Sequence, residues 1–351
     1  MNRRDFLHQT TTASLATLLP QVGHTKMVEK MGIVVHSYWL RWQSKIESSR
    51  FPPLRNALDL LNHCHQLGAG GIQVGIDHWT ADFAKQVRNI SENWGLYVEG
   101  SVSLPKTPND TAAFEQNIIQ AKDAGVKVVR TVCSAGRRYE AYHSLADFRA
   151  FEQNAVAVLE AIEPILRKHR VALGVENHKD WRADEMAALL KKLSSEWIGA
   201  TIDFGNNWAL LEDPTETVHT LAPFVKSTHL KDMAVEAYTD GFRLSEVPLG
   251  EGILDLPALV AVCRQYNPAV TFSLEMITRE PLLIPCLTEA YWETFPNLPG
   301  RYLAHTLKTV NTRSNKGGLP TIAHLSPEEK LAAEDANIRL CLAYGREKLG
   351  L

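Results

Sequence analysis

Four side chains that could bind a divalent cation each follow a short apolar run in the second half of the chain. They are Glu176, Asp203, His229 and Glu275, and successive members are separated by 27, 26 and 46 residues. Three carboxylates and one imidazole form a mainly oxygen donor set, which suits Mn²⁺ or Mg²⁺, with Co²⁺ and Zn²⁺ as alternatives. Buried carboxylates repel one another unless a cation joins them. These residues therefore predict a site for one divalent ion, and Mn²⁺ is the ion that we expect.

The residues two positions before each candidate ligand are small or carry a hydroxyl group: Gly174, Thr201, Ser227 and Ser273. The residues of opposite parity are mostly large and apolar, as in Val175, Ile202, Leu230 and Leu274, and Lys226 and Thr228 are the exceptions. Alternate residues of a strand face opposite sides of its sheet. We therefore expect the four candidates to point into the narrow interior of one sheet, with the large apolar residues facing outward.

Eight short apolar runs alternate with segments of helical periodicity after residue 30, which is typical of parallel βαβ units. The expected strands are Gly32–Ser37, Gly71–Ile76, Leu96–Ser103, Val126–Cys133, Val171–His178, Ile198–Phe204, Val225–Lys231 and Val270–Met276. Helices are expected over Arg55–Leu67, Asp110–Ala124, Ser144–His169, Ala183–Leu193 and Leu256–Tyr266. Eight such units favour an α/β fold of the closed (β/α)₈ barrel type over an open doubly wound sheet.

We expect residues 31–351 to form a single barrel domain with an extended segment between its eighth strand and its last helix. That segment, Ile277–Leu325, is rich in aromatic residues and proline, and its length predicts a lid or rim over the barrel mouth. Ser326-Pro327-Glu328-Glu329 then predicts the start of the final helix through a capping box. The glycines at 68, 70 and 71 precede a strand, so they do not form a dinucleotide-binding turn.

The sequence resembles the xylose-isomerase-like TIM barrels, the sugar phosphate isomerase/epimerase superfamily, from about residue 30 to 276. The likeness includes the four candidate ligands and Pro248-Leu-Gly-Glu-Gly-Ile-Leu-Asp255 after the seventh strand. The resemblance implies that Glu176, Asp203, His229 and Glu275 hold one metal and that Glu176 and Glu275 also act as the catalytic acid/base pair. Proton removal next to a carbonyl, through an enediolate, would make the protein an epimerase or an aldose–ketose isomerase.

Two departures from relatives narrow this expectation. In the superfamily that this sequence resembles, endonuclease IV has an Asp-x-x-His motif after strand six. Here the motif would begin at Asp203, and Asn206 occupies the position of its histidine. The 3-epimerases of this superfamily carry an arginine shortly after the strand-seven histidine. No arginine lies between His229 and Glu236 in this sequence. The lack of a phosphate-binding loop favours an unphosphorylated sugar or glycoside derivative. The alternatives are a 3-keto-glycoside lyase that uses the same residues for β-elimination and, from another class, a sugar-binding protein without turnover.

Several other polar residues are expected near the barrel mouth because they end strands or follow them. His178 and Lys179 come just after Glu176, and His36 and His78 end strands one and two. We expect them to bind substrate hydroxyl groups, because such rim loops carry function. Tryptophans in the same loops could pack on sugar rings: Trp39, Trp42, Trp79, Trp181 and Trp208.

Charge and the first residues indicate where the protein works and what it binds. With 37 basic and 40 acidic side chains the net charge is −3, which argues against nucleic acid as a partner. Residues 1–30 carry Arg3-Arg4 before a weakly apolar stretch, as in a twin-arginine signal or a disordered tail. We expect a periplasmic protein without stable membrane insertion, or a cytoplasmic one if that segment is no signal. Its partner would be a small carbohydrate, and a homo-oligomer is left open.

Overall fold

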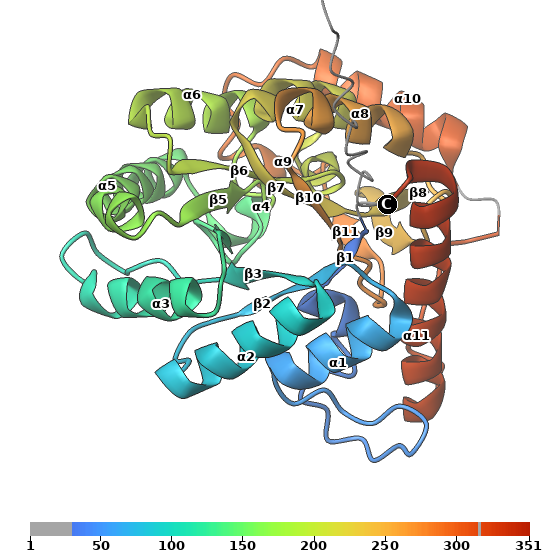
Figure 1. Cartoon of the computed structure of the whole chain (residues 1–351). Helices are drawn as coiled ribbons and strands as arrows, with labels where there is room; N and C mark the ends of the chain where they lie inside the picture. The colour runs from blue at the N-terminus through green and yellow to red at the C-terminus, as the bar shows by residue number, and fades with distance from the viewer. Residues whose placement is uncertain (1–29, 315–316) are drawn as a thin grey trace, which may run out of the picture.

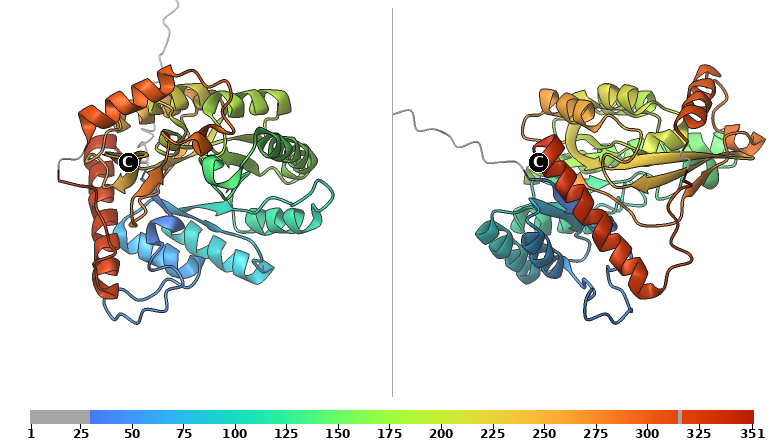
Figure 2. Two further views of the ribbon diagram at one scale, coloured as in Figure 1. Left: turned by 180° about the vertical axis from the view of Figure 1, so that it is seen from behind. Right: turned by 90° about the vertical axis from the view of Figure 1, so that its right-hand side faces the viewer.

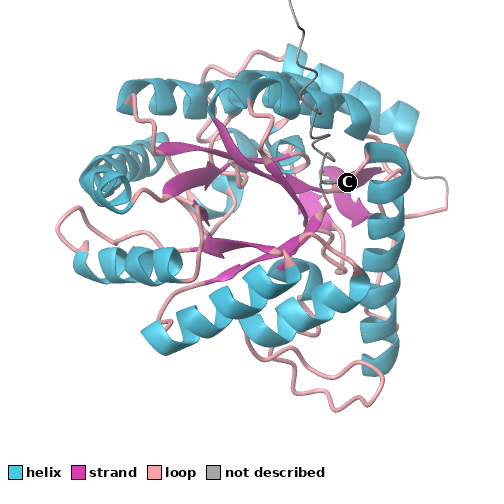
Figure 3. Cartoon of the chain, in the orientation of Figure 1, coloured by secondary structure: helices cyan, strands magenta, loops and turns pink. Residues whose placement is uncertain are grey.

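Eight parallel strands close into a barrel, as the sequence predicts (Figures 1 and 3). The computed structural model describes residues 30–314 and 317–351, so the expected N-terminal signal lies outside the described residues. Around the barrel the strands follow the order β1, β10, β7, β6, β5, β4, β3, β2. Their bounds are β1 Gly32–Val34, β2 Gly71–Gly75, β3 Tyr97–Ser101, β4 Val128–Thr131, β5 Ala172–Glu176, β6 Ile198–Asp203, β7 Val225–Leu230 and β10 Thr271–Leu274. All eight expected strands are present, each shortened at one or both ends.

Helices lie around the strands of this barrel (Figure 3). They are α1 Ala57–Leu67, α2 Ala81–Trp94, α3 Ala112–Asp123, α4 Arg138–Ala141, α5 Leu145–His169, α6 Ala183–Leu193, α7 Pro214–Leu221, α8 Leu256–Tyr266, α9 Glu289–Trp292, α10 Arg301–Arg313 and α11 Pro327–Tyr344. Ser326 and Glu329 form the expected capping box of α11. Short helical turns lie at Val35–Tyr38 (η1), Asn206–Leu210 (η2), Ala222–Phe224 (η3) and Gly345–Leu349 (η4).

The barrel interior is narrow because small and hydroxyl side chains face it. A Cβ on Gly174 would lie 2.1 Å from Thr201 Oγ1, so only glycine fits there. Thr201 Oγ1 in turn lies 2.8 Å from Ser227 Oγ, and Ser273 Oγ lies 2.9 Å from the Tyr97 hydroxyl. The inward parity expected for these positions is therefore confirmed.

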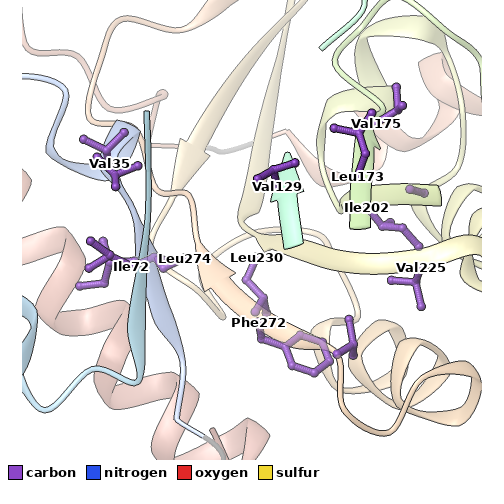
Figure 4. Close-up of a cluster of buried hydrophobic side chains, with 14 of the residues drawn as sticks. Val35, Ile72, Val129, Leu173, Val175, Ile202, Val225, Leu230, Phe272 and Leu274 are labelled. Carbon is purple, nitrogen blue, oxygen red and sulfur yellow. The ribbon is translucent and has the colours of Figure 1, made fainter. Parts of the chain in front are cut away.

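Large apolar side chains of opposite parity pack between the strands and the helices (Figure 4). Leu173, Val175, Ile202, Leu230 and Leu274 are fully buried in this layer. Each fully buried aliphatic side chain of this size contributes roughly 1.5–3 kcal/mol to folding. This layer therefore holds the strand ends, and the side chains they carry, in fixed positions.

A second, three-stranded sheet of β11, β9 and β8 projects from the barrel (Figure 2). β8 (Asp232–Tyr238) and β9 (Gly241–Val247) form a hairpin, and β11 (Leu282–Ile284) pairs with β9. No strand is expected from the sequence between Lys231 and Val270, so this hairpin corrects the predicted secondary structure. Met233 and Val235 on β8, and Phe242 and Leu244 on β9, occupy alternate positions of their strands and are buried in a core cluster of their own.

The segment expected as a lid or rim, Ile277–Leu325, contains β11, α9 and α10. Tyr291 and Phe295 are buried in this second cluster, where the Tyr291 ring stacks on the rings of Tyr139 and Phe295. Figure 2 shows α11 running along the outside of the barrel, beside the first helices. Within residues 30–314 and 317–351, no helix is long and apolar enough to cross a bilayer.

Candidate metal centre and active-site cavity

The four predicted ligand residues meet at the carboxyl ends of adjacent strands. Glu176 ends β5, Asp203 ends β6 and pairs with His229 on β7, and Glu275 follows β10. One potential ligand atom from each residue lies within 4.8 Å of the others, and all four side chains are buried. Because active sites of such barrels lie at this end of the strands, the cluster occupies the expected place for chemistry.

The tautomer of His229 leaves one nitrogen free for a cation. Gln73 Nε2 donates to Glu99 Oε2 at 2.9 Å, so Gln73 Oε1 must accept from His229 Nε2, 2.8 Å away. His229 Nδ1 therefore presents a lone pair and has no hydrogen-bond partner. Oxygens of Glu176 and Glu275 lie 3.5 Å from it and one of Asp203 lies 3.8 Å from it. An orphaned buried nitrogen among three carboxylates fits a divalent ion, and Gln73 orients the ring as outer partners do in metal sites.

The turn after β6 fixes the Asp203 carboxylate. The backbone N–H groups of Gly205 and Asn206 donate to Asp203 Oδ1 at 2.9 and 2.8 Å. The Asn206 side chain donates to Glu176 Oε1 at 2.9 Å. Asp203 Oδ2 accepts from none of these groups and faces the centre of the cluster, where Lys231 Nζ lies 2.8 Å away. Two ligand candidates are thus oriented by the loop that follows one strand.

Two buried cations that were not predicted from the sequence, Arg130 and Lys231, contact the carboxylates. The Arg130 guanidinium donates to Glu176 Oε2, and Lys231 Nζ lies 2.8 Å from Asp203 Oδ2 and 2.6 Å from Glu275 Oε2. Arg130 and Lys231 therefore relieve part of the repulsion between the carboxylates that the expected metal ion would also relieve. Lys231 could have been found by parity, because it lies two residues beyond His229.

The charges of the cluster shift its pKa values in opposite directions. Burial raises the pKa of Glu275, but the Lys231 ammonium group outweighs burial and holds that pKa well below its usual range. Burial likewise opposes ionisation of Glu176, and the Arg130 charge lowers its pKa to about 2. For Asp203, burial prevails over Lys231 and raises the pKa to about 6. Glu176 and Glu275 are therefore ionised at neutral pH.

A cavity of about 380 Å³ opens above the cluster, and Glu275 and Lys231 lie in its wall. Three of the four residues expected at the rim also line it: His36, His178 and Lys179. His36 Nδ1 lies 3.0 Å from Glu275 Oε1. Burial lowers the pKa of His178 to about 4, so its ring is neutral at pH 7.

His78 and most of the tryptophans are not brought to this cavity. His78 is exposed, and its backbone N–H donates to Asn117 on α3, which ties that loop to the helix ring. Of the five candidate tryptophans, Trp39 lines the cavity, with 63% of its surface exposed. Trp181 packs against Phe151, and Trp208 lies in the second core cluster. Aromatic packing explains these positions, and a loop position alone did not distinguish it from substrate contact.

Comparison with known proteins agrees with this fold. D-psicose 3-epimerase, solved in the presence of D-fructose, superposes with a TM-score of 0.59 and 16% identity, covering 92% of this chain and 100% of that one. The 3-keto-D-glucoside 4-epimerase YcjR from E. coli superposes with a TM-score of 0.53 and 12% identity, covering 81% and 99%. In sequence, the chain is 25% identical to a 3-oxo-isoapionate decarboxylase of Pectobacterium atrosepticum over 236 residues, 65% of this chain and 79% of that one.

The closed (β/α)₈ architecture and the buried Glu/Asp/His cluster define a TIM barrel with a potential metal site at the carboxyl ends of its strands. The profile of the xylose isomerase-like TIM barrel family matches residues 61–294, and the chain belongs to that family.

Proposed function

We propose that this protein is a divalent-metal-dependent sugar isomerase or epimerase that removes a proton next to a carbonyl. Glu176, Asp203, His229 and Glu275 would hold the ion, for which Mn²⁺ is our candidate. A bound divalent ion would supply a Lewis acid that polarises the substrate carbonyl. The observation that carries the proposal is the orphaned His229 nitrogen among three carboxylates beneath the cavity.

The residues at the cavity floor suit a two-step proton transfer. Glu275 lines the cavity and is kept ionised by Lys231, so it is our candidate for the base that removes the α-proton. The substrate then carries an enediolate. Glu176 reaches the cluster from β5, three strands along the barrel from β10, and is the proposed partner that returns a proton. Return to the same carbon from the other face gives epimerisation, and return to the neighbouring carbon gives isomerisation.

Two lyase reactions that also pass through an enolate next to the carbonyl form the second candidate function. A 3-keto-glycoside would lose its β-substituent after proton removal. A β-keto sugar acid would instead lose CO₂, the electron pair of the broken C–C bond would form the enolate, and a proton would then be added to that carbon. The likeness to a protein named 3-oxo-isoapionate decarboxylase favours the second of these. A sugar-binding protein without turnover is less well supported, because both glutamates of the acid/base pair are present.

The proposed substrate is an unphosphorylated sugar or glycoside derivative. The proposed workplace is the periplasm, based on the twin arginines at residues 3 and 4. The four ligand candidates and the cavity-lining His36, His178 and Lys179 are our site residues, and His78 is dropped from the proposed substrate contacts.

Exchange of substrate hydrogen with solvent tests the proposed function. The Mn²⁺-loaded protein is incubated in D₂O with free ketoses, keto-glycosides and keto sugar acids, and the products are examined by NMR. We expect deuterium at one carbon of one substrate class, and Glu275→Gln should slow the exchange by about 10²–10⁴-fold because the base is lost. The exposed Glu216→Gln on α7 serves as the control and should exchange at the wild-type rate. Absence of exchange and product with every class would contradict the proposal.

A further inference from the structure

The wall of the active-site cavity carries more positive than negative side chains. Its cations are Arg137, Lys179, Lys231 and Arg279, and its carboxylates are Glu140 and Glu275. The histidines of the wall, His36 and His178, add no carboxylate. A neutral sugar needs hydroxyl and amide partners and no such excess of positive charge. Whether the cavity can attract an anion therefore depends on which of these cations lack a carboxylate partner.

Three of these four cations are already paired with a carboxylate. The distances between the nitrogen and the oxygen are 2.5–2.6 Å in the pairs Arg137–Glu140, Lys231–Glu275 and Arg279–Glu246. Their charges are compensated within the protein, and they position one another as buried or half-buried ion pairs do. They leave little charge for a ligand.

Lys179 is the exception. Its side chain is 5% exposed, and among the described residues no carboxylate oxygen lies within ion-pair distance of its Nζ. The ammonium group donates to Asn206 Oδ1, an uncharged acceptor, and has two further N–H groups. Burial lowers the pKa of Lys179 to about 8, which still leaves it mostly protonated at neutral pH. A buried, unpaired charge costs several kcal/mol, so it persists where something else requires it.

The backbone around Lys179 holds it in a strained position. Its φ angle is +81°, in the left-handed region that side-chain-bearing residues rarely adopt. The buried Asp180 carboxylate accepts from the backbone N–H groups of Ser134, His178 and Trp181 at 2.9–3.3 Å and fixes this turn. Strain of this kind is held by surrounding structure at ligand-binding positions. The geometry, the missing counter-charge and the cavity thus coincide at one residue.

We infer that Lys179 binds a carboxylate of the substrate, so that the protein acts on a sugar acid or keto sugar acid. This inference rests on the proposed function and narrows its substrate class. Asn206 accepts from Lys179 and donates to Glu176, so the bound carboxylate would lie close to the proton-transferring groups. A substrate whose carboxylate lies a few bonds from its carbonyl could contact Lys179 and place that carbonyl beside Glu176 and Glu275 at the same time.

A phosphate group fits this position less well. Phosphate sites usually combine several backbone N–H groups at a helix N-terminus or a guanidinium fork. Here one ammonium group is free, and the arginines of the cavity are already paired with glutamates. A singly charged carboxylate matches a single ammonium group.

Binding by matched acidic and neutral ligands tests the inference. Isothermal titration of the Mn²⁺-loaded protein compares 2-keto-D-gluconate with D-fructose and D-glycerate with glycerol, and includes D-fructose 6-phosphate. We expect at least one acid to bind about tenfold or more tightly than its neutral counterpart. Lys179→Met should abolish that preference, Lys179→Arg should keep much of it, and the exposed Lys85→Met on α2 should leave it unchanged.

The other outcomes would overturn the inference. Equal binding of acids and neutral ligands, failure of both acids to bind at millimolar concentration, or tighter binding of the sugar phosphate would do so. A preference that survives in Lys179→Met would place the carboxylate on the metal instead. Should Lys179→Met fail to fold, the wild-type comparison and Lys179→Arg still decide. Deuterium exchange with neutral sugars alone would contradict this inference but support the proposed function. Preferential binding of acids without any exchange would support this inference but contradict the proposed function.

Discussion

Single side chains in the metal centre are held by chains of hydrogen bonds that cross the barrel. His229 contacts Gln73 on β2, Gln73 contacts Glu99 on β3, and Glu99 accepts from the Thr271 hydroxyl on β10. Burial raises the pKa of Glu99, although both of its partners favour the charged form. Because these hydrogen bonds connect His229 with residues on β2, β3 and β10, they fix the orientation of the imidazole ring.

Replacing Lys231 should separate protein stability from metal affinity. In Lys231→Met, Asp203 and Glu275 lose an ammonium group that lies 2.6–2.8 Å away. We expect the metal-free protein to lose about 3–5 kcal/mol of unfolding free energy, because buried carboxylates are left uncompensated. The more negative site should bind Mn²⁺ on the order of tenfold more tightly. Urea unfolding with a chelator and titration with Mn²⁺ measure the two effects, with Lys85→Met as control. Weaker Mn²⁺ binding at unchanged stability would count against this role of Lys231.

Strand parity predicted the four-residue cluster because it depends only on local alternation. The same rule, extended two residues beyond His229, would have included Lys231. Arg130 and Gln73 could not be found in this way, because they reach the cluster from β4 and β2 through long side chains. Whether Lys179 has a counter-charge depends on loops that are distant in sequence, so its special status required the folded structure.

At the scale of elements, Arg138 joins segments that the sequence leaves far apart. Its guanidinium lies 3.5 Å from the centroid of the Phe148 ring on α5 and 4.0 Å from that of Phe295, after α9. It also donates to the Thr294 carbonyl at 2.7 Å and to Glu185 on α6 at 2.7 Å. This buried cation holds the segment that follows β11 against the helix ring.

Arg138→Met should loosen that segment while leaving the barrel folded. The variant keeps part of the stacked aliphatic volume but loses the charged hydrogen bonds, so we expect about 2–4 kcal/mol less unfolding free energy. Urea denaturation followed by tryptophan fluorescence measures the loss. The exposed Arg301, which stacks on Tyr302, provides the comparison, and Arg301→Met should change stability by less than about 1 kcal/mol. Equal effects of the two substitutions would show that Arg138 does not join these elements.

The barrel elements were predictable because each strand is a buried apolar run between helical segments. The β8–β9 hairpin was missed because a parallel barrel gives no reason to expect an antiparallel pair after β7. The placement of large apolar residues at alternate positions, Met233 and Val235 and then Phe242 and Leu244, was present in the sequence. The structure of residues 233–252 depends on tertiary contacts, because these side chains share a core cluster with Tyr291 and Phe295, which are distant in sequence.

At the scale of the whole molecule, α11 fastens the beginning of the barrel. Glu334 on α11 accepts from the backbone N–H of Leu40, just after η1, at 2.7 Å. The Glu334 side chain is fully buried, and its Oε2 has no hydrogen-bond partner. Burial raises its pKa from the ordinary 4.5 to about 8. The folded protein thus keeps a proton on Glu334 at pH values where the unfolded chain has released it.

Stability should therefore fall as pH rises from about 4.5 to about 8 and level off above that range. Glu334→Gln removes this titration and retains an acceptor for Leu40. We expect the variant to be about 1–3 kcal/mol more stable than the wild type at pH 9 and to show a flatter profile between pH 5 and 9. Thermal and urea unfolding across that range measure the effect, with the exposed Glu328→Gln of the same helix as control. Parallel profiles for wild type and Glu334→Gln would refute the assignment.

Closure of the barrel by its first and last strands has a consequence for biosynthesis. β1 pairs with β10 through Gly32 and Ser273, the Ser37 hydroxyl donates to the Leu274 carbonyl, and His36 meets Glu275. While the ribosome is still translating the codons before residue 271, β1 and β7 each expose an edge that awaits its neighbour. A nascent polypeptide halted there contains three of the four candidate ligands, because Glu275 has not yet been added. Tight binding of Mn²⁺ would therefore show that synthesis has passed β10.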